Sequence, residues 1–270
     1  HRAVSVNDEN KLVAKAGSGD CPCKQFTLEV VSSGAERVAE LAQRADHVIV
    51  CAGNQPLINA REEYDRPDIR LPKAQTALLN AAAAANESTL LYLVTGYPFA
   101  INKEKDTAKA VLCSTHLGPC LGHVAAATVF GENNPAGRTP TTWYRSVRDL
   151  PALDDYDIAK NHVTYLYFRG KPLYAFGYGL SYTTFAYSNL TVKQENGEVI
   201  ATVNVQNTGA LNGDEVVQLY MSLPGSLRVR PIHALKAFKR VHIKAGETVT
   251  VTLNFKIDDL AVWCNGRKIY

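Results

Sequence analysis

Residues 34–53, GAERVAELAQRADHVIVCAG, change from a helical to a strand-like period without an intervening linker. The first part places apolar side chains at the i, i+3, i+4, i+7 spacing of one helix face, namely Val38, Leu41, Ala42 and Ala45. An apolar run from His47 to Cys51 follows and ends at Gly53, which predicts a short strand with Cys51 as a small buried residue. A helix that leads directly into an apolar strand is typical of α/β proteins.

The same alternation continues downstream. Pro72 opens an alanine-rich segment that predicts a helix to about Ala85, since proline is favoured in the first helical turn. Residues 89–95 and 109–114 predict two more apolar strands, and residues 121–130 predict a helix closed by Gly131. Apolar strands separated by amphipathic helices indicate an α/β sandwich with a mostly parallel sheet that is covered on both faces.

The C-terminal part has a different period. Apolar residues alternate with polar ones from Val199 to Val205 and again from Val249 to Phe255, which is the pattern of half-buried antiparallel strands. Asn196–Gly197, just before the first set, is a strong hairpin signal. We therefore expect an all-β sandwich of immunoglobulin or fibronectin type III shape. The change of period near Thr184 predicts two domains, residues 1–184 and 185–270.

The composition excludes several protein classes. The chain has 270 residues, of which 46% are hydrophobic and 20% charged, so it can bury a sizeable core. A net charge of +3, spread along the chain, gives no basis to expect nucleic acid or a membrane surface as a partner. No apolar run approaches the roughly 20 residues of a membrane span. The chain begins at His1 without an initiator methionine, which suggests a processed or truncated N-terminus and leaves the compartment open.

Cofactor and metal motifs are also missing from the sequence. The spacing Cys21–Pro22–Cys23 lacks the two-residue spacer of a zinc or redox pair, so we expect no metal site. No G-x-G-x-x-G follows a strand, and neither a phosphate-binding loop nor a G-x-S-x-G serine elbow is present.

Polar residues gather where two of the predicted strands end. The loop after Gly53 begins with Asn54 and contains the charged stretch Arg61–Glu62–Glu63–Tyr64–Asp65–Arg66, and the strand at 109–114 is followed by His116. Ligands bind at the carboxyl ends of the strands in open α/β sheets. By themselves, these residues fit either a solvated charge cluster or a site in which one carboxylate acts as a general acid/base.

Five blocks of sequence, in order, resemble glycoside hydrolase family 3. EEYDR with the following L-P-x-x-Q (62–75) is similar to the family's E-G-x-D-R…L-P-x-x-Q, and FGENNPAGRTPTTWY (130–144) is similar to F-G-D-x-N-P-x-G-R-x-P-x-T-W-Y. YAFGYGLSY (174–182) resembles Y-x-F-G-Y-G-L-S-Y. Two further blocks, NTG with GDEVVQLY (207–220) and LKAFKRV with AGE (235–247), resemble the family's fibronectin type III-like module.

The resemblance implies an activity and a set of roles. Family members are retaining exo-acting glycosidases, commonly of β-glucosidase or β-xylosidase type, and their two-carboxylate mechanism needs no cofactor. By position the acid/base falls on Glu62, with Glu63 as the fallback, while Asn54, Arg61 and His116 are candidates for the rim of the substrate pocket. The nucleophile lies on an N-terminal (β/α)₈ barrel, for which 270 residues already holding two domains leave no room. The implied partners are that barrel and a β-linked glucoside or xyloside.

The sequence departs from the family pattern in two places. Glu63 stands where many members have a small residue, and residues 113–122, CSTHLGPCLG, replace the family's W-Y-P-G-Q-E-G-G loop. A like charge beside Glu62 would raise the pKa of one of the two carboxyl groups, which suits an acid catalyst. The altered loop leaves open an alternative function, that of a non-catalytic carbohydrate-binding or scaffolding fragment with the same fold.

Overall fold

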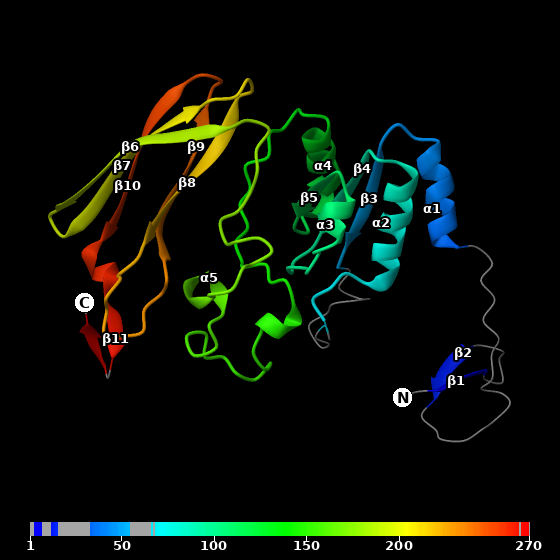
Figure 1. Cartoon of the computed structure of the whole chain (residues 1–270), viewed down its shortest axis with the longest axis horizontal. Coiled ribbons are helices and arrows are strands. Elements are labelled where there is room, and N and C mark those ends of the chain that lie inside the picture. Colours follow the sequence, from blue (N-terminus) through cyan, green and yellow to red (C-terminus); the bar gives the residue numbers. More distant parts are fainter. Residues whose placement is uncertain are drawn as a thin grey trace.

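The structure is a computed structural model that describes residues 3–6, 12–15, 33–54, 66, 68–264 and 266–269. In the N-terminal and α/β parts, the elements are β1 (Ala3–Val6), β2 (Leu12–Lys15), α1 (Gly34–Gln43), β3 (Val48–Gly53), α2 (Lys73–Ala85), β4 (Thr89–Val94), α3 (Glu104–Thr107), β5 (Ala110–Ser114), the 3-10 helix η2 (Gly118–Cys120) and α4 (Leu121–Val129). The remainder holds η3 (Val147–Asp149), α5 (Thr164–Tyr167), β6 (Phe185–Glu195), β7 (Glu198–Asn207), β8 (Gly213–Met221), β9 (Ala234–Ile243), β10 (Thr248–Lys256), η4 (Ile257–Leu260), β11 (Val262–Cys264) and β12 (Arg267–Ile269). Figure 1 shows the α/β part and the all-β part as separate bodies joined by a long connection.

The α/β part contains the predicted parallel sheet. Its strand order is β3-β4-β5, and both neighbouring pairs are parallel. Helix α2 starts directly after Pro72, and Gly131 follows α4 with a left-handed φ of 79°, as expected for a glycine that closes a helix. The predicted α/β sandwich with a mostly parallel sheet is thereby confirmed.

One face of this sheet forms the core. Val50 and Leu91 on the strands pack with Leu79 of α2, which is fully buried, and Val38 of α1 packs against the same cluster. The two helices lie on the same side of β3 and β4 (Figure 1). Leu41 was expected on this face, but it is 59% exposed because α1 contacts α2 through its other side chains.

The opposite face is open at β3. Side chains alternate along a strand, so Ile49 and Cys51 point away from the face that carries Val50. Ile49 is 49% exposed and Cys51 is exposed as well. The predictions that Cys51 is buried and that helices cover both faces are therefore wrong at β3, because α1 and α2 lie on the same face.

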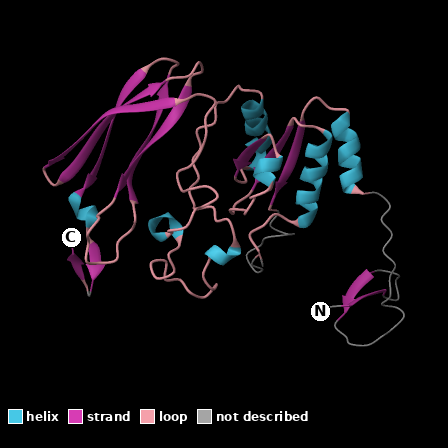
Figure 2. Cartoon of the chain, in the orientation of Figure 1, coloured by secondary structure: helices cyan, strands magenta, loops and turns pink. Residues whose placement is uncertain are grey.

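The long connection between α4 and β6 has little regular structure in Figure 2, yet it is tightly paired. Trp143 forms an isolated antiparallel bridge with Tyr174, and the two rings meet edge to face with centroids 5.7 Å apart. Tyr165 stacks on Phe176 at 4.0 Å, and Tyr174 stacks on Tyr178 at 5.1 Å. Pairs of this kind stabilise a chain segment beyond the area that they bury. The sequence pattern had not predicted this packing.

The all-β part is the expected sandwich of antiparallel sheets. One sheet has the order β10-β7-β6 and the other pairs β8 with β9, and Val205, Val217, Ile243, Val251 and Leu253 fill the core between them. Asn196 and Gly197 have φ values of 49° and 79°, which are the left-handed values that a two-residue hairpin turn requires. The β6–β7 hairpin and the period-two strands β7 and β10 agree with the sequence prediction.

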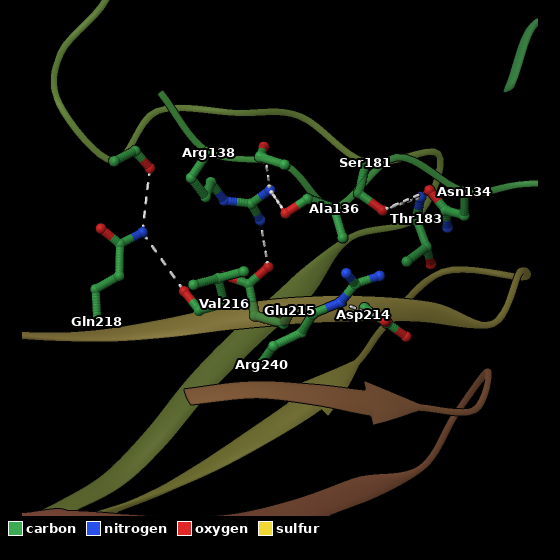
Figure 3. Close-up of polar contacts among 12 residues, drawn as sticks. Asn134, Ala136, Arg138, Ser181, Thr183, Asp214, Glu215, Val216, Gln218 and Arg240 are labelled. Atoms are coloured by element: carbon green, nitrogen blue, oxygen red, sulfur yellow. Dashed lines mark hydrogen bonds and ion pairs between the residues drawn. The ribbon is translucent and has the colours of Figure 1, made fainter. Parts of the chain in front are cut away.

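A polar seam joins the long connection to the sandwich (Figure 3). The Arg138 guanidinium donates to Glu215 Oε2 at 2.6 Å, and both side chains are only 12% exposed. Tyr187 donates to the other carboxylate oxygen at 2.8 Å, and burial together with this hydrogen bond raises the pKa of Tyr187 well above its usual range. Glu215 is thus paired at both oxygens, as a buried carboxylate must be.

Two asparagines extend the seam. Asn134 Oδ1 accepts from Ser181 Oγ at 2.9 Å, and its Nδ2 donates to Asn212 O at 2.9 Å. Asn207 is fully buried: it donates to Ile243 O at 2.9 Å and accepts from Thr183 Oγ1 at 2.6 Å. These amides join the connection to the β7–β8 loop and to the end of β7, which is itself tied to the end of β9.

Candidate functional site

The carboxyl edge of the parallel sheet carries two of the predicted site residues, Asn54 and His116. Asn54 follows β3, Gly96 follows β4 and His116 follows β5. With neighbouring strands about 4.8 Å apart, the ends of β3 and β5 are roughly 10 Å from each other.

The exit from β3 is fixed by a glycine. Gly53 has a φ of 136°, and a Cβ at this position would lie 1.9 Å from the carbonyl oxygen of Val94. Any larger residue would push β3 away from β4. The chain therefore leaves the sheet in a direction that depends on Gly53.

Gln75 of α2 binds the backbone of Gly53 through its side-chain amide. Its Nε2 donates to Gly53 O at 3.0 Å, and its Oε1 accepts from Gly53 N at 3.1 Å. This reciprocal pair explains the spacing in L-P-x-x-Q: Leu71 is buried, Pro72 caps the helix, and Gln75 then lies in the first turn beside β3. Sequence reasoning treated Gln75 only as part of a motif and missed this positioning role.

We expect Gln75→Ala to lower the free energy of unfolding by about 1–3 kcal/mol, because both backbone groups of Gly53 lose the side-chain amide. Urea denaturation of the chain measures the change. Asn80→Ala is the matched control on the exposed side of the same helix and should change stability by less than about 0.5 kcal/mol. Equal effects of the two substitutions would show that the Gln75 pair is not stabilising.

Asn54 is a buried tie between two strand ends. Its backbone N–H donates to Val94 O at 3.2 Å, and its Oδ1 accepts from Gly96 N at 2.9 Å. Its exposure is 7%. The side chain thus joins the end of β3 to the segment after β4 through its Oδ1.

His116 lies in the turn between β5 and η2, with an exposed side chain. The strand end before it is tied to β4, since Thr95 N donates to Ser114 O at 2.9 Å and Tyr92 Oη lies 2.7 Å from Ser114 Oγ. The structure places His116 on the same edge as Asn54 but brings no carboxylate of the described residues to it.

Arg61, Glu62 and Glu63 lie outside the described residues, so their side chains have no assigned position here. The residue at the far end of that loop, Arg66, is described. Its guanidinium lies over the rings of Tyr97 and Phe99, 5.0 and 4.9 Å from their centroids, and donates to Pro98 O at 3.3 Å. Partial burial lowers the pKa of Arg66, while Tyr97 acts in the opposite direction.

Asn54 and Arg66, which flank residues 55–65, are thus both attached to the same sheet edge. Asn54 contacts the turn after β4, and Arg66 contacts residues 97–99 of the same turn. The Arg66 anchor combines cation–π contacts with a hydrogen bond to a carbonyl, and its hydrogen-bond partner lies 32 positions away in sequence.

Residues 4–182 match the glycosyl hydrolase family 3 C-terminal domain. The chain belongs to glycosyl hydrolase family 3. Residues 215–269 match the fibronectin type III-like domain that the all-β sandwich resembles. The family resemblance carried by the five sequence blocks is thereby confirmed, together with the predicted fold class.

Known relatives of this family 3 chain are glycosidases of greater length. It is 35% identical over 242 residues to the periplasmic beta-glucosidase of Salmonella typhimurium, an alignment covering 84% of this chain and 32% of the relative. It is 33% identical to the xylan 1,4-beta-xylosidase of Xylanibacter ruminicola, covering 84% of this chain and 27% of that protein. The chain therefore spans about a third of the length of these curated relatives or less.

Solved family 3 structures have the same arrangement. The beta-glucosidase of Bifidobacterium adolescentis superposes with a TM-score of 0.80 at 30% identity, over 90% of this chain and 38% of that one. The Kluyveromyces marxianus beta-glucosidase in complex with glucose gives a TM-score of 0.78 at 30% identity, over 85% of this chain and 29% of its own. The two-part architecture is thus that of known beta-glucosidases.

The described residues hold neither a metal-binding cluster nor a helix suited to a membrane. These residues do not gather three or more histidine, cysteine, aspartate or glutamate side chains in a group that could hold a metal ion. Among the helices they form, none combines the length and apolar character that crossing a membrane requires.

Proposed function

We propose that the chain is the C-terminal part of a retaining exo-acting β-glycosidase of β-glucosidase or β-xylosidase type. In this proposal Glu62 is the acid/base, with Glu63 as the alternative, and the nucleophile is on an N-terminal (β/α)₈ barrel outside this chain. The observation that carries the proposal is the family match over residues 4–182, and the contacts of Asn54 and Arg66 at the carboxyl edge of the sheet support it. The substrate is a β-linked glucoside or xyloside.

The attachment of Asn54 and Arg66 to the sheet edge suits an acid/base residue located between them in the sequence. A retaining glycosidase needs two carboxyl groups about 5–5.5 Å apart on opposite sides of the scissile bond. The acid must first donate a proton to the leaving oxygen and then take one from the attacking water, so its position has to be held through both steps. Asn54 and Arg66 flank the segment that contains Glu62, and both are attached to the sheet edge at which the barrel is proposed to dock.

The residues around Glu62 have proposed binding roles. The Nδ2 of Asn54, the Arg61 guanidinium and the His116 imidazole can each donate a hydrogen bond to a sugar hydroxyl. Asn54 and His116 support this assignment by their shared place at the sheet edge. A charged Glu63 beside Glu62 favours the protonated form of one carboxyl group, as the first step requires.

The domain division belongs to the same proposal. Residues 1–184 would form the family's α/β sandwich domain, which docks the barrel at the edge that carries Asn54 and His116. Residues 185–270 would form the fibronectin type III-like domain, which supports the first through the seam of Arg138 and Glu215. The mechanism needs only water besides the two carboxyl groups, so no cofactor is proposed.

The test compares the complete enzyme, with its barrel, and the isolated chain. Hydrolysis of p-nitrophenyl β-glucoside and β-xyloside is followed by absorbance, and the anomer that forms first is identified by NMR. The complete enzyme should hydrolyse at least one substrate with retention, and the isolated chain should hydrolyse neither. An inverted product, or equal rates for chain and complete enzyme, would overturn the proposal.

Calorimetry separates this proposal from a non-catalytic binding fragment. Cello- and xylo-oligosaccharides are titrated into the isolated chain. A half-site should give no measurable affinity, because half of the pocket is on the barrel. Saturable binding by the chain alone, combined with an inactive complete enzyme, would favour the carbohydrate-binding alternative.

A further inference from the structure

A pocket of about 320 Å³ lies far along the chain from the sheet edge, between the segment at 159–169 and the loop that joins β8 to β9. In Figure 1 that loop runs beside α5. The contact is direct, since Ile232 N donates to Leu166 O at 2.7 Å and Tyr165 Oη accepts from Leu235 N at 3.3 Å. None of the residues assigned to the glycosidase site lines this pocket.

The lining of the pocket is strongly basic. Its basic members are Arg169, Arg228, Arg230 and His162, and no aspartate or glutamate is among its lining residues, all of which the structure describes. Ser222 and Ser226 add two hydroxyl groups. Three guanidinium groups around one cavity repel each other, so the cavity favours a negatively charged occupant.

The neighbouring carboxylates have other partners. Asp155 pairs with Lys160 at 3.1 Å, and Asp157 Oδ1 accepts from Lys160 N at 2.9 Å. On η4, Asp258 pairs with Lys268, and Asp259 Oδ2 accepts from Lys256 N at 3.3 Å. These acids lie on elements adjacent to the pocket, and each is engaged outside the lining. They do not neutralise the three arginines by direct pairing.

One of the three arginines is held in place. Arg230 Nη1 donates to Leu260 O at 2.6 Å, and Arg230 Nε donates to Ser226 Oγ at 3.1 Å. The same Ser226 Oγ accepts from Arg228 N at 3.2 Å, so the loop is folded around this hydroxyl. An oxyanion arriving here meets a cation whose position is already set, which lowers the entropic cost of binding.

The other two arginines are available to a ligand. Arg169 and Arg228 are exposed, and no carboxylate of the described residues pairs with either. The wall that carries His162 is in turn fixed: His162 and Thr164 have left-handed φ values of 52° and 61°, and Thr164 N donates to Tyr144 Oη at 2.7 Å. A β-branched residue adopts this conformation only where its surroundings enforce it.

From this arrangement we propose that the pocket between α5 and the β8–β9 loop binds a small oxyanion through Arg169, Arg228 and Arg230. A guanidinium offers parallel N–H donors that match the oxygens of a carboxylate or phosphate. Two sources present this chemistry, the carboxylate of a uronic acid and inorganic phosphate. The binding site is separate from the proposed glycosidase site, so neither proposal depends on the other.

Isothermal titration calorimetry of the complete chain at low salt tests the site with sodium phosphate, sodium glucuronate and neutral glucose. We expect saturable binding of at least one anion, with an affinity that falls when NaCl is added. Glucose, which carries no charge, should give no binding under the same conditions. Phosphate binding alone assigns the pocket to the free ion, and glucuronate binding alone assigns it to a uronic acid. Binding of both shows that the oxyanion group itself is recognised.

The double variant Arg169→Gln/Arg228→Gln should weaken that binding by at least about tenfold, as expected for the loss of charge-assisted hydrogen bonds. Arg37→Gln, an exposed arginine on α1, is the matched control and should bind as the parent does. Circular dichroism checks that each variant is folded, and single Arg228→Gln replaces the double variant if needed. Absence of saturable binding by either anion, or equal weakening by Arg37→Gln, would overturn the proposal.

Discussion

Replacing the proposed acid/base by its amide, Glu62→Gln, should lower kcat of the complete enzyme by about 10²–10⁴-fold on alkyl glycosides and oligosaccharides. Glutamine has nearly the same size and can still hydrogen-bond to the substrate, but it cannot donate a proton to the leaving oxygen or take one from water. Substrate binding should therefore survive. Steady-state kinetics with cellobiose and xylobiose measure kcat and KM separately.

Azide and Glu63→Gln supply the controls. Azide attacks the glycosyl-enzyme without needing a general base, so it should restore turnover of an aryl glycoside by the Glu62→Gln variant and yield a β-glycosyl azide. Glu63→Gln should have a much smaller effect than Glu62→Gln. A reversed order would assign the role to Glu63, and full activity of both variants would end the assignment of the acid/base to this loop.

Removing one partner of the seam, Arg138→Met, should destabilise the chain by about 3–5 kcal/mol. The Arg138 and Glu215 side chains are each 12% exposed, so the substitution leaves a carboxylate in a largely buried position without its cation. Tyr187 keeps its hydrogen bond to Glu215 but carries no charge to replace the guanidinium. Urea unfolding followed by circular dichroism gives the free-energy difference.

Arg240→Met is the matched control for this experiment. Arg240 pairs with Asp214 close to the same seam (Figure 3), but its side chain is 62% exposed, and solvent screens such a pair. The expected loss is at most about 1 kcal/mol. If Arg138→Met costs no more than Arg240→Met, the Arg138–Glu215 pair does not hold the two parts together.

Local periodicity predicted the helices α1, α2 and α4 and the strands β3, β4, β5, β7 and β10. The apolar run at 47–51 became β3 at Val48–Gly53, and Asn196–Gly197 became the turn between β6 and β7. Periodicity does not say what covers a strand, which is why the exposure of Cys51 was missed. It also gave no account of the connection between α4 and β6, whose order comes from aromatic contacts such as Trp143 with Tyr174 rather than from a repeating pattern.

The part of the candidate site that follows from the order and direction of the strands could be predicted from the sequence. Parallel strands end at one edge, and Asn54 and His116 follow two strands of the same parallel sheet. The supporting contacts of Gln75 and Arg66 join residues 22 and 32 positions apart, and no local pattern encodes such pairs. The arginine pocket depends on a still longer separation, between Arg169 and the β8–β9 loop.

The paired connection between α4 and β6 has a mechanical consequence. A flexible tether would let the two parts of the chain tumble and melt independently, whereas stacked rings and the Arg138–Glu215 pair transmit displacement from one part to the other. Unfolding of the sandwich is then coupled to unfolding of the parallel sheet. The chain should accordingly unfold in a single cooperative step, and the proposed barrel would meet one rigid partner instead of two loosely joined ones.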